Sequence, residues 1–370
     1  MWNVALLGDV CQISSSKRIF AKEYQKKGIP FYRGKEIIEK HKGNDVTTEL
    51  FISPDRYKEI KNKYEVPRKG DVLLTSVGTL GVTWLVDEDE FYFKDGNITW
   101  LRPNEKIIPE FLYLWLNSTE AQNQIDAKCI GSTQKALTIE TLNKFYISLP
   151  SIDLQYKIIA IIKPLEDKIV NNRKINKNLE QQAQAIYSCM FIEHRQESWS
   201  TGQLSDLISV KYGKDHKKLA DGNYPVYGSG GIMRYVEKPL YTGESVLIPR
   251  KGTLNNVMYV SEAFWSVDTM FYTEMLHPNI AKFVYHFVKS KDLASLNAGS
   301  AVPSMTTNII NAMQLYIPDE KTLEKFENIV SPMYSAMQEN TKESKILANT
   351  RDTLLPKLMS GELDVSDIDL

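Results

Sequence analysis

The sequence predicts a mixed α/β protein in which two tandem α+β domains are separated by two long antiparallel helices. Three observations carry this prediction: a heptad spacing of apolar residues in the middle of the chain, its recurrence near the C-terminus, and a similar block of sequence before each helix. The chain therefore contains an internal pseudo-twofold repeat. At 370 residues it is long enough for two domains and additional elements.

The central helix is predicted from residues that recur at alternating steps of four and three, the spacing of a helix that packs against another helix. The same spacing recurs 168 residues later, so each helix has a partner within the chain, and together they are expected to form a coiled-coil spacer. The predicted seam residues are Ile158, Ile162, Leu165, Ile169, Asn172, Asn176, Leu179, Phe326, Val330, Met333, Met337, Asn340, Leu347 and Leu354.

The middle of each seam is polar, with Asn172 and Asn176 in the first helix and Asn340 in the second. Because the middles of antiparallel helices meet, Asn172 and Asn340 should lie close together, where a polar layer would fix register. The pattern leaves open whether their side chains bond each other or stay partly solvated. Pro164 and Pro332 stand at equivalent places, and since interior proline kinks a helix, we expect a short lead-in segment to meet each long helix at an angle.

Each helix follows a block in which short motifs occur in the same order, beginning with Leu7-Gly-Asp-Val in the first block and Leu204-Ser-Asp-Leu in the second. The predicted division is a domain over residues 1–150, a helix within 151–195, a second domain over 196–318 and a second helix within 319–370. In the first block the predicted elements are a short helix near 54–64, a hairpin about Asp95-Gly96-Asn97, one amphipathic helix over 109–125 and a helix start near Thr138.

The composition is that of an ordinary water-soluble protein, with 42% apolar and 25% charged residues. The formal net charge of -1 excludes a polycation, so nucleic-acid binding requires locally concentrated Lys and Arg or a partner that shares the contact. We find no secretory layout and no apolar run long enough to span a bilayer, and therefore expect a cytoplasmic protein. Cys11, Cys129 and Cys189 are far apart, with no CxxC pair and no nearby histidine set, which argues against a zinc site or a disulfide framework.

The usual enzyme motifs are missing from the sequence: it has no GxxxxGK[ST] phosphate loop, no HExxH and no GxSxG. Asp55 and Glu59-Ile-Lys61 resemble a nuclease string, but the two acids are too close together on a predicted helix. The sequence also has no Asp/Asn-Pro-Pro-aromatic methyltransferase motif. We therefore expect no covalent chemistry, no metal and no cofactor in this chain.

Signals for binding recur at matching positions of both blocks. Lysine and arginine residues follow the opening motif of each block. Glycine-containing loops further along carry amides, hydroxyls and guanidinium groups, which can contact base edges or the backbone of DNA. Each stretch by itself is also compatible with an ordinary solvated loop. The candidate DNA-binding residues are Lys17, Arg18, Arg33, Ser76, Thr79, Ser132, Thr133, Gln134, Lys135, Lys211, Tyr212, Lys214, Tyr227, Ser229, Arg250, Lys251, Thr253, Asn255, Asn256 and Ser300.

With these features, the sequence resembles the specificity (S) subunit of type I restriction-modification systems. The resemblance covers nearly the entire chain. It rests on the stretches GIPFYRGKEI, GDVLLTSVGTLG and YPVYGSGGI, and most specifically on LEDKIVNNRKINKNLEQQAQAIY and the ending LLPKLMSGELDV.

The resemblance implies two target-recognition domains, each binding half of a split double-stranded DNA site, with the two helices as a spacer. It implies that the chain is not itself an enzyme: two modification subunits would bring S-adenosylmethionine and methylate adenine, and two restriction subunits, where present, would add cleavage. Because the two blocks have diverged, the half-sites should differ in sequence. The alternative is a coiled-coil scaffold that binds protein and not DNA.

Overall fold

The chain forms two compact units in the computed structural model, which describes residues 2–44, 46, 48–87, 90–128, 136–296 and 304–368. One unit consists of Met1–Lys174 with Asn340–Leu370, and the other of Ile175–Glu339. Each unit therefore combines one α/β domain with a segment of both long helices.

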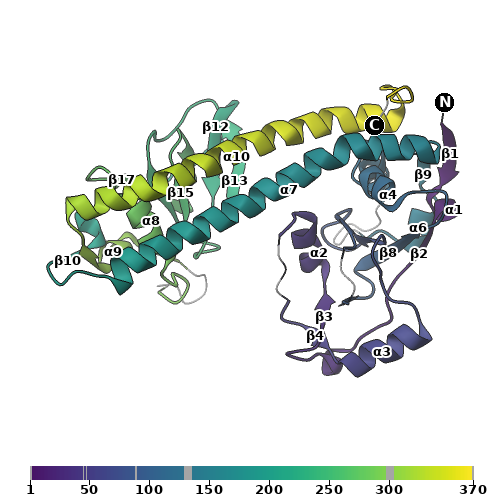
Figure 1. Ribbon diagram of the computed structural model, residues 1–370, viewed down its shortest axis with the longest axis horizontal. Helices are drawn as coiled ribbons and strands as arrows, with labels where there is room; N and C mark the ends of the chain where they lie inside the picture. Colours follow the sequence, from purple (N-terminus) through teal and green to yellow (C-terminus); the bar gives the residue numbers. More distant parts are fainter. Residues whose placement is uncertain are drawn as a thin grey trace. The chain divides into compact units, whose positions relative to one another are not determined.

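The domain of the first unit contains three small sheets. Its described strands are β1 (Asn3–Leu6), β2 (Cys11–Ser14), β3 (Ile29–Tyr32), β4 (Phe51–Ile52), β5 (Val72–Thr75), β6 (Thr83–Leu85), β7 (Tyr92–Phe93), β8 (Ile98–Pro103) and β9 (Tyr146–Leu149). An antiparallel sheet has the order β2-β8-β5-β6, and a second sheet has the order β4-β3-β7 with β3 parallel to β7. Strand β1 pairs with β9 in a ribbon (Figure 1).

Short helices connect these strands, and several begin where the sequence supplies a cap. They are α1 (Leu7–Val10), the 3₁₀ turn η1 (Ala21–Glu23), α2 (Gly34–His41), α3 (Pro54–Lys63), α4 (Pro109–Leu116), α5 (Thr119–Lys128) and α6 (Ile139–Asn143). Helix α3 starts at Pro54, and the Ser53 hydroxyl accepts the Arg56 N–H at 3.1 Å. The Thr138 hydroxyl caps α6 in the same way, so both predicted helix starts are confirmed.

The domain of the second unit repeats this arrangement. Its described elements are β10 (Ser200–Gln203), η3 (Leu204–Asp206), β11 (Ile208–Tyr212), β12 (Asp221–Gly228), β13 (Gly231–Val236), β14 (Ser245–Pro249), β15 (Met258–Val260), β16 (Trp265–Ser266), β17 (Met270–Met275), α8 (Ala281–Lys289), α9 (Thr307–Asn311) and β18 (Gln314–Ile317). The sheets have the orders β11-β17-β14-β15 and β13-β12-β16, with β12 parallel to β16, and the ribbon is β10-β18. The matching topology confirms the internal repeat.

Two predicted elements of the first domain differ from the structure. The helix expected over 109–125 is two helices, because the Ser118 hydroxyl accepts the Ala121 N–H at 3.4 Å and starts α5 anew. The hairpin expected about Asp95-Gly96-Asn97 is instead a connection between two sheets, since β7 pairs with β3 while β8 pairs with β2 and β5. Long-range strand pairing has overridden a local turn signal.

The two long helices are α7 (Ile152–Ser188), which ends in a π-helical turn, η2 (Cys189–Glu193), and α10 (Glu320–Ser360). Each helix continues through its proline, Pro164 or Pro332, so the residues before the proline belong to the same helix; the expected angle at the proline stays a prediction. No helix in the described part of the chain is both long enough and apolar enough to cross a bilayer.

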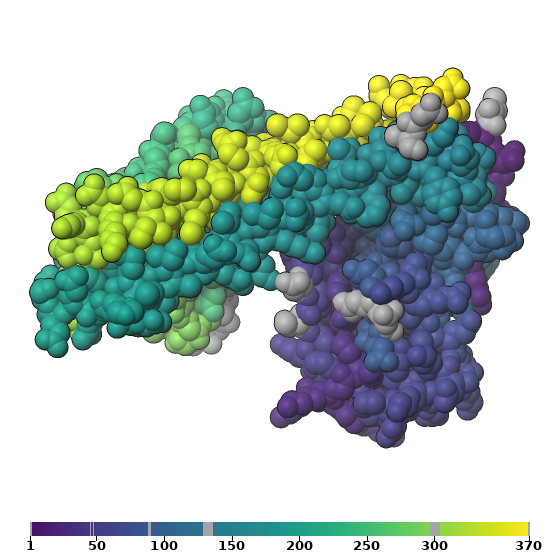
Figure 2. Space-filling model, in the orientation of Figure 1, coloured from purple at the N-terminus to yellow at the C-terminus, as the bar shows by residue number. Residues whose placement is uncertain are grey.

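The helix pair is antiparallel in both units. In the first unit Glu166 of α7 lies near Arg351 of α10, and Lys168 of α7 lies near Glu343 of α10. A residue later in α7 therefore contacts a residue earlier in α10, as in an antiparallel pair. Figure 2 shows the atoms of α7, in teal, and α10, in yellow, in contact along the face that is viewed. All the predicted seam residues are buried or half-buried; Ile158, Ile162, Phe326 and Val330 are fully buried.

Asn172 is the buried polar centre of the helix pair, 1% exposed. Its Nδ2 donates to the backbone oxygen of Asn340 at 3.3 Å, to Glu343 Oε2 at 2.7 Å and to Ser344 Oγ at 3.2 Å. The expected proximity of Asn172 and Asn340 is confirmed. The Asn172 amide bonds the backbone oxygen of Asn340, and its other acceptors are the Glu343 carboxylate and the Ser344 hydroxyl. In the second unit Asn176 Nδ2 donates to the backbone oxygen of Met337 at 3.0 Å.

Each helix segment also completes the hydrophobic core of its own unit. In the first unit Ile158 and Leu358 belong to the cluster that contains Phe111 and Trp115 of α4. In the second, Tyr187 and Phe326 belong to the cluster that contains residues of α8. Burying a large apolar side chain contributes about 1.5–3 kcal/mol, so the helices are integral to each unit's stability.

Asn172→Ala should lower the free energy of unfolding by about 1–2 kcal/mol, because it removes a buried hydrogen-bond donor while its acceptors stay in place. Asn172→Leu should recover stability, since Asn172 Oδ1 has no hydrogen-bond partner among the described residues and a leucine would extend the apolar seam. Thermal unfolding followed by circular dichroism measures both variants. The exposed Lys174→Ala is the control, and equal midpoints for Asn172→Ala and this control would contradict the proposed role of the amide.

Candidate nucleic-acid interface

In both units a glycine-containing loop of the four-stranded sheet, after β5 in the first unit and after β14 in the second, pairs with a segment distant in the chain. Val77 bridges Ala136 in the first unit, and Lys251 bridges Ser304 in the second. The loops that the sequence singled out after β5 and after β14 are thereby joined to the chain just before α6 and α9. The candidate residues Ser132, Thr133, Gln134, Lys135 and Ser300 lie outside the described residues.

In the first unit, Lys17, Arg18 and Thr79 are exposed on loops of the domain. The Lys17 backbone N–H donates to the Tyr92 hydroxyl at 2.7 Å, which fixes the loop after β2. Arg18 forms an ion pair with Asp95 at 2.9 Å but remains largely exposed. All three side chains are thus accessible to a macromolecular ligand, with Arg18 already held by Asp95.

Arg33 and Ser76 are engaged within the fold instead. Arg33 bonds Glu36 at 2.8 Å; burial opposes ionisation of this carboxyl, but the hydrogen bonds from Arg33 outweigh it and hold the pKa of Glu36 below its ordinary value. Ser76 is 3% exposed, and its backbone bonds Asn97 and Leu137. The expectation that Ser76 presents its side chain on a loop is therefore wrong: the strand-to-loop transition turns it inwards.

In the second unit, the structure gathers candidates from three separate stretches. The Arg250 guanidinium lies 5.5 Å from the ring centroid of Tyr212, which is 52% exposed, and donates to the Asp268 backbone oxygen at 3.3 Å. Asn256 Nδ2 donates to the Ser229 backbone oxygen at 2.8 Å, which ties the β14–β15 loop to the β12–β13 turn. The further candidates Lys214, Lys251 and Thr253 are exposed.

Several other candidates of this domain already have partners. Asn255 bonds Asp292 at 3.0 Å and also accepts the Ala294 N–H at 3.0 Å, Tyr227 donates to Glu262 at 3.1 Å, and Lys211 lies 3.5 Å from Glu274. Adenine recognition by the Asn255 amide would require these internal bonds to break. We therefore rank Arg250 and Lys251 above Asn255 as contacts to DNA.

The repeat aligns unlike residues at one equivalent position. The Ser76 backbone oxygen accepts the Leu137 N–H at 2.9 Å, and the Arg250 backbone oxygen accepts the Met305 N–H at 2.9 Å. A buried serine in one domain thus corresponds to a half-exposed arginine in the other. The shared backbone geometry with different side chains is what two different DNA sequences would require.

The sequence did not reveal a polar cluster that fastens the second domain to its helix segments. Lys282 of α8 is 4% exposed and contacts Glu244 at 2.9 Å and Glu327 of α10 at 2.6 Å. Tyr285 and Lys289 both bond Glu180 of α7. The available signal was the occurrence of lysine and histidine in the otherwise apolar stretch AKFVYHFVK.

His286 is the fully buried member of this cluster. Its Nδ1 lies 2.8 Å from Gln184 Oε1 and its Nε2 lies 2.9 Å from the Tyr334 hydroxyl. Burial lowers the pKa of His286 to about 4, so the imidazole is neutral near pH 7. The domain is thus joined to both helices through a neutral, fully bonded histidine.

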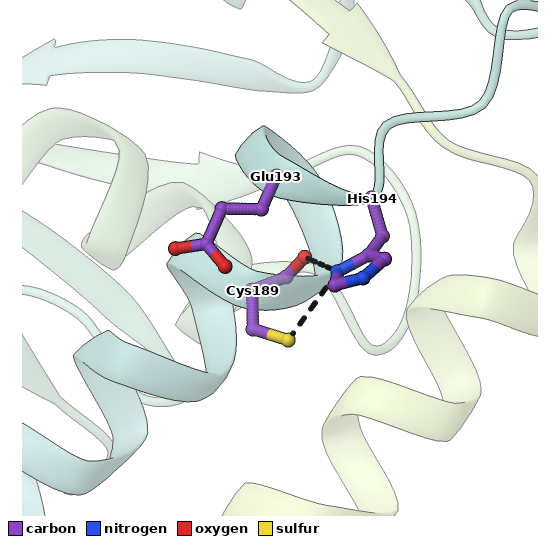
Figure 3. Close-up of side chains that lie close together, drawn as sticks. All are labelled: Cys189, Glu193 and His194. Carbon is purple, nitrogen blue, oxygen red and sulfur yellow. Dashed lines mark hydrogen bonds between the residues drawn. The ribbon is translucent and has the colours of Figure 1, made fainter.

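Cys189, Glu193 and His194 come together at the turn that ends α7 (Figure 3). His194 Nδ1 lies 3.0 Å from the Cys189 backbone oxygen and 3.5 Å from its Sγ. The bond to the carbonyl is a common way to satisfy a helix C-terminus. All three side chains are exposed, and the cap accounts for the proximity of His194 and Cys189.

The chain is a tandem-domain protein in which an α/β domain occurs twice and each copy shares its core with segments of two antiparallel helices. A family model described as a type I restriction modification DNA specificity domain matches residues 1–181 and 196–347. The chain belongs to this family and is a DNA sequence-specificity subunit; such subunits are non-catalytic. The alternative of a scaffold without DNA recognition is not favoured.

Individual relatives agree with this assignment. The MjaIX specificity subunit of Methanocaldococcus jannaschii is 21% identical over 414 residues, covering 99% of this chain and 94% of that protein. The HindI specificity subunit of Haemophilus influenzae is 32% identical over 165 residues, covering 41% of this chain and 36% of that protein. The crystal structure of a type I system S subunit from M. genitalium, 18% identical, has the same fold, with a TM-score of 0.60 over 97% of this chain and 96% of that one.

The low pKa of His286 predicts that acid weakens the second unit. The folded-state pKa lies below that of an unfolded histidine, so the stability contributed by the neutral ring is present above about pH 6.5 and is lost as the pH falls towards 4. Between pH 7 and pH 5 the expected loss is about 2 kcal/mol. In urea unfolding, the free energy of unfolding of His286→Gln should fall less between pH 7 and pH 5 than that of the wild type. The exposed His277→Gln variant should lose as much as the wild type. Identical pH dependence in all three proteins would contradict this prediction.

Proposed function

We propose that each α/β domain contacts one half of a bipartite double-stranded DNA site and that the α7–α10 pair sets the spacing between the halves. The observation that carries this proposal is the duplicated topology with different side chains at equivalent loop positions, such as Ser76 and Arg250. Two short contacts on one chain give one long specific site, because the second contact becomes intramolecular. The asymmetry of the loops supports unlike half-sites.

The charge distribution supports a shared contact with DNA. The net charge is only -1, and several cations are paired internally, Arg33 and Lys211 among them. Phosphate contacts supply much of the affinity of DNA-binding proteins. We infer that partner subunits add phosphate contacts around the two domains.

Two modification subunits would dock on the helices and domains and would bind S-adenosylmethionine, which this chain is not expected to hold. They would methylate adenine, which must leave the base stack to be modified, and this chain would position the DNA for that step. Where a nuclease is present, two restriction subunits would complete the assembly. The complex would act in the cytoplasm, where its DNA substrate lies.

Exchanging residues 1–150 for the corresponding domain of a relative should change one half of the methylated motif and leave the other half unchanged. The reason is that each domain folds around its own core and carries its own loops. Genome-wide mapping of adenine methylation in cells that co-express the chain with its modification partner measures both halves. Simultaneous change of both halves would contradict independent reading, and absence of any motif with an active partner would contradict the proposed function.

Inserting four residues after Asn176 should alter the spacer between the half-sites without altering their sequences. Four helical residues add about 6 Å, which corresponds to the rise of roughly two base pairs. The same methylation mapping measures the number of base pairs between the half-sites. We expect this number to change by about one or two, or methylation to cease. A change in the half-site sequences themselves would show that the helices do more than set the distance.

A further inference from the structure

Two lysines of the first unit lie over one exposed aromatic ring. Lys17 Nζ is 4.5 Å and Lys63 Nζ 5.8 Å from the ring centroid of Tyr64, which is 42% exposed. The two ammonium groups are therefore no more than about 10 Å apart. Lys17 comes from the loop after β2, whereas Lys63 and Tyr64 come from the end of α3, so the fold brings together charges that are distant in sequence.

Neither lysine has a carboxylate within ion-pair distance in the described part of the chain. The two arginines of the same stretches do: Arg18 is paired with Asp95, and Arg56 with Glu23 and Glu59. Glu65, the acid next to Tyr64, is bound by Arg102. These four acids thus have other partners, and the described part of the chain places no carboxylate within ion-pair distance of the two ammonium groups.

The backbone on both sides of the cluster is held in place. The Lys17 N–H donates to the buried Tyr92 hydroxyl at 2.7 Å, and the Ser16 hydroxyl donates to the Phe93 backbone oxygen at 2.7 Å. Helix α3 is anchored by the buried Tyr57 and Ile60. The aromatic ring attracts both ammonium groups and so restricts the two lysine side chains before any ligand binds. A bound anion would therefore pay less conformational entropy to order them.

We propose that Lys17, Lys63 and Tyr64 form a binding site for the phosphodiester backbone of the DNA held by the first domain. This inference rests on the proposed function, and adds Lys63 and Tyr64 to the interface. Ammonium groups make charge-assisted hydrogen bonds to phosphate oxygens, and the tyrosine hydroxyl can donate one more. Such contacts fix the register of DNA without selecting its sequence.

The experiment measures binding of a random-sequence DNA duplex to the complex of the full chain with its modification partner, by fluorescence anisotropy over a range of salt concentrations. Each phosphate contact contributes about 0.9 to the slope of log affinity against log salt. The double variant Lys17→Ala/Lys63→Ala should reduce the slope by about one to two and weaken binding roughly fivefold to tenfold at about 0.1 M salt. Lys106→Ala, an exposed lysine of the same unit, is the matched control and should leave the slope unchanged.

Tyr64 gives an independent arm. Tyr64→Phe keeps the ring that positions both lysines and should retain most of the affinity, whereas Tyr64→Ala should weaken binding; unchanged thermal unfolding shows that the variants are folded. A double lysine variant whose slope equals that of Lys106→Ala overturns the inference while the proposed function stands. Absence of salt-dependent binding by the wild-type complex would overturn the proposed function as well. A methylated motif that loses base preference in the double variant would also contradict a backbone contact.

Discussion

The buried stripe of the two long helices is the constraint on which both units depend. Each long helix uses one face both for the other helix and for a domain, so that Ile158 of α7 in the first unit and Phe326 of α10 in the second belong at once to the helix seam and to a domain core. A helix that only separated two domains could lose seam residues without unfolding them. Here a change of register would move every buried side chain of the stripe, and a polar centre such as Asn172 restricts that register.

The two domains use one backbone plan to present different surfaces. Their sheets have equivalent strand orders, and equivalent loops are closed by the same backbone hydrogen bond, yet the residue at that point is Ser76 in one and Arg250 in the other. The exposed cation sites also differ: Tyr64 with two lysines in the first domain and Tyr212 with Arg250 in the second. Backbone hydrogen bonds tolerate such substitution, because they do not depend on the side chain. A duplicated scaffold can thereby acquire two distinct binding specificities.

Internal pairing decides which of the charged and polar residues are available to a ligand. Residue type and loop position indicated the candidates, of which Lys17, Thr79 and Lys251 are exposed; that they contact DNA stays a prediction. Arg33 is bound by Glu36, three residues along the chain, whereas Asn255 is bound by Asp292, a partner that these criteria could not identify because it is distant in the chain. The same criteria also overlooked Tyr64, because an aromatic residue at a helix end gives no sign of exposure.

The sequence by itself determined the periodic features: two heptad helices, two equivalent blocks, and a polar point where Asn172 meets Asn340. Periodicity and repetition are properties of the chain, and burying an apolar stripe leaves few arrangements for two such helices. Only the tertiary structure decided that each helix runs through its proline, that β7 and β8 belong to different sheets, and that His286 is neutral within a domain-to-helix cluster. These outcomes depend on pairings between residues far apart in sequence, whose energies exceed the local preferences of a proline or a turn. The same reason explains why two lysines at one ring were not foreseen.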